Sequence, residues 1–208
     1  MIKTRQLRFS YPSLQFHFPD ISCEAGDALL ITGGSGKGKT TLLHLLAGIQ
    51  KPESGEIMID QQDIGQLKDH RLDQFRGQHI GIVFQQAHFV ASLTIMENIE
   101  LAAHLSGRKT GKDAILSLLT ELDIAAQAGK KPATLSIGQL QRASIARALV
   151  NQPAVLLADE PTSSLDDENC EKVAALLLRM ASQHRSALII VTHDNRLKQL
   201  FNNSIALQ

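Results

Sequence analysis

One glycine-rich segment constrains the fold of this chain more than any other stretch of its sequence. Residues 33–40, GGSGKGKT, match the spacing G-x-x-x-x-G-K-[ST], in which backbone N–H groups surround a phosphate chain. The apolar run 29–31 in front predicts a buried strand, and residues 41–47 predict a helix whose N-terminal dipole faces the anion. Because strand, loop and helix follow in this order, a phosphate-binding loop is favoured over a chance glycine-rich turn.

The residue types in this loop are those that a bound nucleotide requires. Glycines allow backbone angles closed to residues with a Cβ and let the chain approach the phosphates. Lys39 is expected to bridge the β- and γ-phosphates, and the Thr40 hydroxyl to ligate Mg²⁺. For Lys37 a solvated side chain is the simpler interpretation, because the motif does not require it. The predicted nucleotide-binding residues here are Gly33, Gly34, Ser35, Gly36, Lys37, Gly38, Lys39, Thr40 and Thr41.

The chain's length and composition favour one α/β domain without a strong bias toward charged partners. Its 208 residues carry a net charge of zero, which gives no global signature of nucleic-acid or membrane-surface binding. Cys23 and Cys170 are far apart and are expected to be free thiols in a reducing cytosol. The apolar runs are too short to span a bilayer, so we expect no membrane crossing by this chain.

Hydrophobic periodicity predicts three regions along the chain. Residues 2–9 and 14–18 are expected to be strands of an antiparallel layer, followed by a strand at 56–60, a short helix at 71–75 and a strand at 80–84. A helical insertion comes next, with helices at 94–105, 113–122 and 136–150. The α/β alternation then resumes with strands at 154–158, 187–192 and 204–207 and helices at 168–184 and 196–200.

Two carboxylates follow the apolar strand 154–158, at the end where open α/β sheets bind ligands. Asp159 suits the shell of Mg²⁺, and Glu160 is placed to accept a proton from the water that attacks the γ-phosphate. Alone, such a pair is more typical of a helix cap or a solvated loop, but a phosphate loop upstream favours catalysis. Ser136 and Gln139 form a capping box whose helix N-terminus is also a potential anion site.

Six motifs in this order resemble those of the ATP-binding cassette (ABC) ATPases, and the match covers essentially the whole chain. The resemblance implies a P-loop NTPase (RecA-like) core with an N-terminal antiparallel β layer and an inserted α-helical subdomain. It implies one nucleotide-binding domain over residues 1–208, with the subdomain at about 86–150. The motifs are the phosphate loop GGSGKGKTT, Gln85 in IVFQQ, the signature LSIGQLQR, the Walker B segment VLLADEPT, the D-loop Ser164-Leu165-Asp166, and His193 after ALIIVT.

The resemblance also implies roles that spacing does not give. Two cassettes would associate head to tail, with Ser136, Gly138 and Gln139 of each contacting ATP held by the other. Gln85 would sense Mg²⁺ and the γ-phosphate, and His193 would contact the γ-phosphate and help hold the catalytic glutamate. Without the resemblance, both would be interpreted as solvated polar residues.

Tyr11, the only tyrosine, lies where the family places an aromatic side chain that stacks on adenine. Packing against the antiparallel layer is the alternative for this residue.

The function that this resemblance implies is an ATP-hydrolysing subunit that drives a separate integral membrane permease from the cytoplasmic face of the membrane. A second ATPase subunit, identical or different, would complete the motor. The run at residues 81–105 is similar to the lipoprotein-release and macrolide-export branch. The alternative, a soluble cassette acting on DNA or ribosomes, usually carries a long coiled coil or two cassettes in one chain, and neither is present. We therefore expect no nucleic-acid partner.

One departure from the family pattern predicts a measurable effect. The usual signature has glycine at the position of Ile137, and glutamine is common at that of Leu140. A β-branched side chain beside the γ-phosphate would hinder close approach of the two subunits. We expect Ile137→Gly to strengthen ATP-driven dimer closure and raise the ATPase rate, and an unchanged rate at saturating ATP and protein would contradict this.

Overall fold

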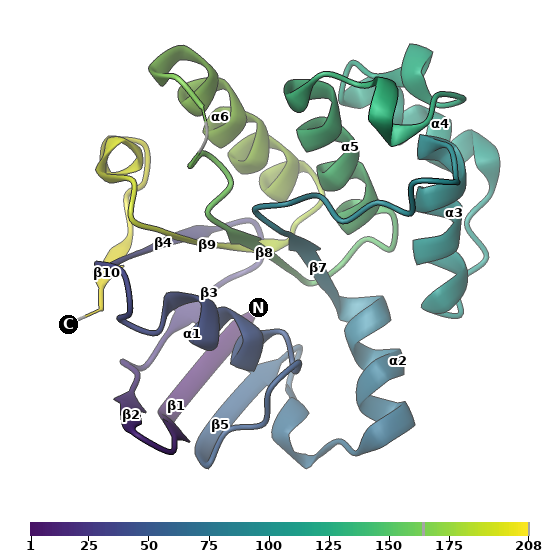
Figure 1. Cartoon of the computed structure of the whole chain (residues 1–208). Helices are drawn as coiled ribbons and strands as arrows, with labels where there is room; N and C mark the ends of the chain where they lie inside the picture. Colours follow the sequence, from purple (N-terminus) through teal and green to yellow (C-terminus); the bar gives the residue numbers. More distant parts are fainter. Residues whose placement is uncertain (164, 208) are drawn as a thin grey trace.

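Two β-sheets enclose helix α1 in the computed structural model, which describes residues 1–163 and 165–207. Figure 1 shows α5 and α6 on one side of the parallel sheet and α1 with the antiparallel sheet on the other. The parallel sheet has the strand order β10 (Ser204–Ala206), β4 (Ala28–Thr32), β9 (Ala187–Thr192), β8 (Val155–Asp159) and β7 (Ile80–Val83). The antiparallel sheet has the order β2 (Leu14–His17), β1 (Ile2–Tyr11), β5 (Ser54–Ile59) and β6 (Gln62–Asp63), with β3 (Ser22–Cys23) paired to β1.

The helices divide between the core and the insertion that separates β7 from β8. The α-helices are α1 (Lys39–Leu46), α2 (Asp69–His79), α3 (Ile95–Leu105), α4 (Lys112–Glu121), α5 (Ile137–Leu149) and α6 (Asp167–Gln183). Short 3₁₀ helices lie at Ile64–Gln66, Ala125–Gln127, Pro132–Thr134 and Asn195–Gln199. Among the described residues, none of the helices combines the length and apolar character needed to span a membrane.

Alternation along the buried parallel strands produces two apolar clusters. In β4, Leu29 and Ile31 pack with α1 and the antiparallel sheet, whereas Leu30 packs with α5 and α6. All three side chains are buried. The sheet is therefore covered on both faces, and its strand ends are the part left for a ligand.

The expected α/β class with an antiparallel layer and inserted helices is confirmed, while several boundaries differ. The strand expected at 2–9 extends to Tyr11 as β1, and the helix expected at 71–75 runs over Asp69–His79 as α2. The apolar pattern of α2 is weak because, among the described side chains, Leu72 and Phe75 are the ones that pack against the core. The two-residue strands β3 and β6 were not predicted, since segments this short carry no periodic pattern.

Capping boxes begin two helices of the insertion, including the one expected at Ser136 and Gln139. The Thr94 hydroxyl accepts a hydrogen bond from the Glu97 N–H at 3.2 Å, and the Glu97 carboxylate accepts one from the Thr94 N–H at 2.7 Å. Ser136 and Gln139 repeat this arrangement at the start of α5. These local hydrogen bonds fix where each helix starts, independently of its packing.

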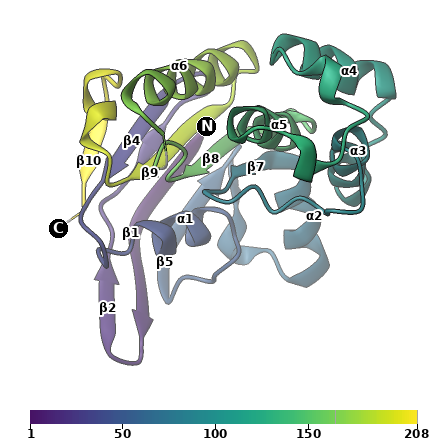
Figure 2. The ribbon, with the colours of Figure 1, turned by 45° about the horizontal axis from the view of Figure 1, so that its top comes forward.

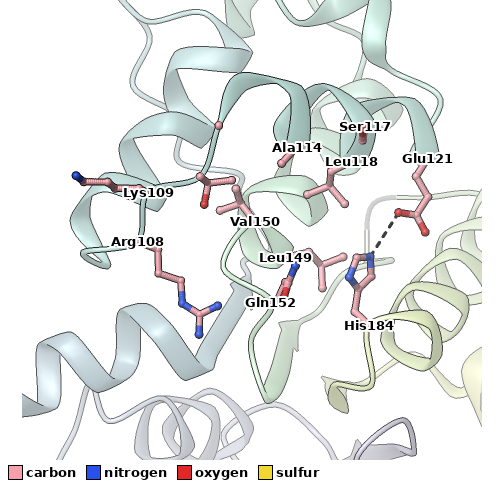
Figure 3. A pocket seen from close by; sticks show the side chains of 12 residues that line it. Arg108, Lys109, Ala114, Ser117, Leu118, Glu121, Leu149, Val150, Gln152 and His184 are labelled. Carbon is pink, nitrogen blue, oxygen red and sulfur yellow. Dashed lines mark ion pairs between the residues drawn. The ribbon is translucent and has the colours of Figure 1, made fainter.

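The junction between the insertion and the core contains a hollow of about 720 Å³, shown in Figure 3. His184, which follows α6, has its Nε2 atom 3.4 Å from Oε2 of Glu121 in α4. On the other side, the Arg108 guanidinium donates a hydrogen bond to the carbonyl of Asn151. Polar contacts of this kind connect α4 and the loop before it to the core.

Candidate nucleotide site

The predicted phosphate loop lies between β4 and α1 and borders a hollow of about 780 Å³. Gly36 and Gly38 have φ angles of 79° and 82°, in the left-handed region that favours glycine. A Cβ at Gly38 would lie 2.6 Å from the ring of Phe16 in β2. Glycine is therefore required at position 38 both for its backbone angle and because an aromatic ring covers it.

Positive charge gathers at the start of α1. Among the described residues, no side chain caps this helix, so its first N–H groups and its dipole favour an anion. The Lys39 ammonium donates hydrogen bonds to the carbonyls of Gly33 at 2.9 Å and Gly34 at 3.1 Å. Its Nζ atom lies 3.8 Å from Oε1 of Glu160, and both side chains are largely buried. The lysine thus joins the loop to the end of β8.

Asp159, the last residue of β8, presents a half-buried carboxylate with one buried, unused oxygen. Its Oδ1 atom has no hydrogen-bond partner among the described residues. Burial, and then the neighbouring charge of Glu160, raises the pKa of the Asp159 carboxyl above its usual range, while the Thr40 hydroxyl and Lys39 oppose this shift. A cation bound here would relieve the cost of the buried charge.

Glu160 is held by the residues that end β9. Its backbone has a φ of 47°, a left-handed conformation that costs a non-glycine residue about 1–2 kcal/mol, and its N–H donates to the Val191 carbonyl at 2.9 Å. The Thr192 hydroxyl donates to Oε2 at 2.7 Å, and the His193 N–H donates to Oε1 at 3.0 Å. The His193 ring contributes Nδ1 at 2.8 Å from Oε1. The carboxylate therefore has little freedom to turn.

Gln85 reaches the same hollow from beyond the end of β7. Its Nε2 atom donates a hydrogen bond to Oγ of Ser163 at 3.1 Å, which links it to the segment after β8. The carboxyl ends of β4, β7, β8 and β9 thus converge on one place, as parallel sheets require of a ligand site.

Tyr11 lies beside this hollow rather than in it. Its hydroxyl lies 3.4 Å from Oγ1 of Thr41 and accepts a hydrogen bond from the Gln50 side chain at 3.2 Å. Its ring meets those of Phe9 and Phe16 edge-on, at centroid distances of 4.9 and 6.2 Å. Of these three aromatic residues, only Phe16 lines the hollow in the described part of the chain. Tyr11 is nevertheless 40% exposed, which leaves room for contact with a ligand.

Most of the residues predicted from the phosphate loop and its partners come together. Gly33 is set back against the Leu207 carbonyl, and Lys37 is exposed and borders a different hollow. The predicted residues that line the hollow are Gly34, Ser35, Gly36, Gly38, Lys39, Thr40, Thr41, Gln85, Glu160 and His193.

The signature residues line a second hollow of about 420 Å³ and, among the described residues, none of them lines the first. Ser136 and Gly138 border this second hollow, while Gln139 is engaged in the capping box. Ile137 is 70% exposed between them. Leu165 and Asp166 of the expected D-loop also border it, whereas Ser164 lies outside the described residues.

Sequence reasoning did not identify Phe16, Ser163 or Thr192 as part of the site. The alternation at residues 14–18 placed Phe16 on one face of a strand but gave no sign that this face covers the phosphate loop. Thr192 and Ser163 adjoin recognised motifs, so their positions next to His193 and the Walker B segment were the available signal.

Comparison with known proteins connects this geometry to a family. Residues 17–163 match the family described as ABC transporter. The lipoprotein-releasing system ATP-binding protein LolD of Syntrophotalea carbinolica is 43% identical over 180 residues, covering 86% of this chain and 79% of that protein. LolD of Porphyromonas gingivalis is 38% identical over 200 residues, covering 95% of this chain and 91% of that protein.

Solved structures show the same fold. The dimeric structure of MJ0796, described as a bacterial ABC transporter cassette, has a TM-score of 0.85 and 32% identity, covering 100% of this chain and 94% of that chain. A dimeric post-hydrolysis state of MJ0796 bound to ADP and phosphate has a TM-score of 0.86 at 32% identity over the same shares of the two chains.

A parallel sheet with this phosphate loop at its strand ends defines a P-loop nucleotide hydrolase. With a family match over most of its length and relatives well above 30% identity, the chain belongs to the ABC transporter family and is an ATP-binding, ATP-hydrolysing cassette. None of these named similarities supports the alternative of a cassette that acts on DNA or ribosomes.

The raised pKa of Asp159 predicts that its ionised carboxylate lowers the stability of the nucleotide-free protein. The folded chain binds this proton more tightly than the unfolded chain, so the carboxylate lowers stability above the raised pKa and ceases to do so as the pH falls through it. Asp159→Asn should therefore raise the Tm of the nucleotide-free protein at pH 8, and its advantage should shrink on acidification. In a chain of this size, each 1 kcal/mol corresponds to about 2–4 °C.

Thermal unfolding from pH 8 down to about pH 4, near the ordinary pKa of an Asp carboxyl, measures this effect. The exposed α6 carboxylate Glu171 provides a matched control, and Glu171→Gln should leave the Tm unchanged. A wild-type protein more stable than Asp159→Asn at pH 8 would show that the buried carboxylate is compensated within the chain.

Proposed function

We propose that this chain hydrolyses ATP at the hollow between the phosphate loop and the end of β8, and thereby drives a separate membrane permease as one of two cassettes. The observation that carries the catalytic part is the Glu160 carboxylate, fixed by Thr192 and His193 beside Lys39. A base held in one orientation next to a phosphate cradle is what in-line attack by water requires.

The phosphate loop would bind the triphosphate through backbone N–H groups and one side-chain charge. Lys39, which donates hydrogen bonds to two loop carbonyls, is a cation placed to reach the phosphates. Phosphate-loop contacts are assigned to Gly33, Gly34, Ser35, Gly36, Lys37, Gly38, Lys39, Thr40 and Thr41. We assign Tyr11 to stacking on adenine, which its partial exposure beside Thr41 supports.

The residues beside the loop fit a magnesium ion. The partnerless Oδ1 atom of Asp159 is a buried hard oxygen, and the Thr40 hydroxyl neighbours the same carboxylate. We assign Thr40, Asp159 and Gln85 to holding Mg²⁺, which would neutralise the charge that develops on the phosphates. The raised pKa of Asp159 favours this assignment, because a cation would lower it again.

Glu160 would take the proton of the attacking water while His193 keeps it in place. The histidine ring lies on the solvent side, with 61% of its side chain exposed, and its N–H and ring both contact Oε1. We assign His193 to contact the γ-phosphate as well, and Gln85 to report its presence to a partner.

A second cassette would complete the site. Ser136, Gly138 and Gln139 are assigned to ATP held on the other subunit. Two observations support this: the signature hollow is separate from the phosphate hollow, and both related MJ0796 structures are described as dimeric. Residues 1–208 would then form one nucleotide-binding domain, with its helical subdomain at about 86–150.

The relatives suggest the system that this motor serves. LolD proteins are named as the ATP-binding part of a lipoprotein-releasing system, and CbiO1 of Clostridium perfringens is described as part of an ABC transporter complex. We infer that this chain sits on the cytoplasmic face of the membrane, bound to permease subunits of the same kind, and that it has no nucleic-acid partner.

Glu160→Gln tests the assignment of the base. The variant keeps the phosphate cradle but loses the proton acceptor, so it should bind ATP, form a dimer that persists, and hydrolyse ATP at least about 100-fold more slowly. Steady-state phosphate release and size-exclusion chromatography with and without ATP measure these effects.

Lys39→Ala distinguishes a loss of ATP binding from a loss of hydrolysis. This variant should lose most ATP binding, and therefore should not form the persistent dimer expected of Glu160→Gln.

If Glu160→Gln hydrolyses ATP at the wild-type rate, another group is the base.

Affinity purification from detergent-solubilised membranes tests the partner. We expect an integral membrane permease to remain bound to the tagged chain. This permease should be extracted from the membranes only when detergent is present. Recovery of ribosomes or DNA in place of a membrane protein would contradict the proposed assembly.

A further inference from the structure

Arg147, in the last turn of α5, is bound to the loop that carries Gln85. Its Nη1 atom donates a hydrogen bond to the His88 carbonyl at 2.9 Å, and its Nη2 atom donates one to the Ala87 carbonyl at 2.6 Å. The guanidinium carbon lies 4.6 Å from the centroid of the Phe89 ring. Three consecutive residues of this loop thus contact one side chain.

These contacts are the main compensation for the arginine's charge. The side chain is half-buried, and burial lowers its pKa. Among the described residues, no carboxylate lies within ion-pair distance of Arg147. Two carbonyl dipoles and an aromatic face therefore replace the water that the guanidinium has lost.

The backbone that Arg147 holds is strained. His88 has a φ of 43°, which a residue with a Cβ adopts at a cost of about 1–2 kcal/mol. The hydrogen bond to the His88 carbonyl helps to keep this conformation, together with the edge-on contact between the rings of His88 and Phe84. Gln85 precedes this turn by three residues, lines the nucleotide hollow and donates a hydrogen bond to Ser163.

The opposite end of the same helix carries the signature residues. Ser136 caps α5 and Arg147 lies eleven positions further along, about 16 Å at 1.5 Å per residue. A helix is stiff over this length, so a tilt of the signature end displaces Arg147 and the loop that it grips. Helix α5 therefore connects two parts of the proposed site. One is the loop with Gln85, which would sense the γ-phosphate, and the other is the signature end of the helix, which would contact the ATP of the second cassette.

We propose that Arg147 is a positioning residue that fixes Gln85 in the nucleotide hollow and couples its place to the orientation of α5. This inference rests on the proposed function, because it assumes that Gln85 contributes to ATP hydrolysis. Among the described residues, Arg147 is not one of those that line the nucleotide hollow, and it acts through the backbone of residues 87–89.

Arg147→Met removes both hydrogen bonds and the charge while keeping an apolar side chain against Phe89. We expect kcat to fall about tenfold or more while KM for ATP changes less than about threefold, because the phosphate loop is intact. The Mg²⁺ concentration for half-maximal activity should rise several-fold, since Gln85 is assigned to the metal. A role in stability alone would lower Tm and the yield of active protein without moving the Mg²⁺ dependence.

Non-additivity is the decisive observation. If Arg147 acts through Gln85, the double variant Arg147→Met with Gln85→Ala should be no slower than the slower single variant. Two effects that multiply would overturn the inference even if each single variant is slow. If Gln85→Ala alone hydrolyses ATP at the wild-type rate, the role proposed for Gln85 is wrong, and the inference about Arg147 falls with it.

Arg108 offers a matched control at the junction of Figure 3. Like Arg147, it donates a hydrogen bond to a backbone carbonyl near α5, that of Asn151, but among the described residues it donates none to the Gln85 loop. Arg108→Met should keep kcat within about twofold of wild type. An equal loss of kcat in Arg108→Met would mean that any arginine tie between insertion and core has this effect.

Arg147→Lys keeps the inference testable if the methionine variant folds poorly. Lysine retains the charge over Phe89 but lacks the planar fork that reaches two carbonyls at once. We expect a Tm close to wild type and a kcat between those of wild type and Arg147→Met. Full wild-type kcat and Mg²⁺ dependence in Arg147→Lys would show that the charge alone suffices and that positioning by the fork is wrong.

Discussion

The parallel pairing of β8 with β9 is the interaction on which the rest of the site depends. Asp159 is opposite Val191 in this ladder, and the Glu160 N–H extends the pairing by one hydrogen bond to the Val191 carbonyl. This register brings Thr192 and His193 to the Glu160 carboxylate. Because β4 pairs with the other edge of β9, the phosphate loop is set against the same residues. A shift of one residue would turn every side chain to the opposite face and separate the carboxylates from the loop.

Several charged groups and one backbone conformation at the site are energetically unfavourable in the nucleotide-free protein. Lys39 and Glu160 are largely buried, Asp159 has a carboxylate oxygen without a partner among the described residues, and Glu160 holds a left-handed backbone angle. The surrounding apolar strands keep these groups in position, since the core residues of β4, β8 and β9 are nearly all inaccessible. The fold thus uses stability gained in its sheet to maintain an arrangement that favours a polyphosphate and a cation. The same relation holds on a smaller scale at His88, where Arg147 keeps a strained turn.

Much of the fold and site chemistry could be predicted from local sequence, because it depends on local rules. Glycine spacing, the capping boxes and the apolar strands each arise from neighbouring residues, and the predicted elements match except at boundaries such as those of α2. Contacts between distant segments could not be predicted this way. Phe16 over Gly38, Gln85 with Ser163, and Arg147 with Ala87 join residues more than twenty positions apart, which periodicity does not encode. The family resemblance filled part of this gap but gave no sign of Phe16 or Arg147.

The ring of Phe16 over Gly38 has a consequence for how the chain reaches its native state. Phe16 pairs with Phe9 in the β1–β2 hairpin, which extends beyond the rest of the ribbon in Figure 2. If this hairpin slipped by one residue, Gln15 or His17 would replace the ring above the loop. The register of the hairpin therefore also decides whether the Phe16 ring covers the phosphate loop. Because a ligand that binds only the folded state stabilises it by mass action, ATP bound at this loop would also stabilise the correctly paired hairpin, which lies far from the catalytic carboxylate in sequence.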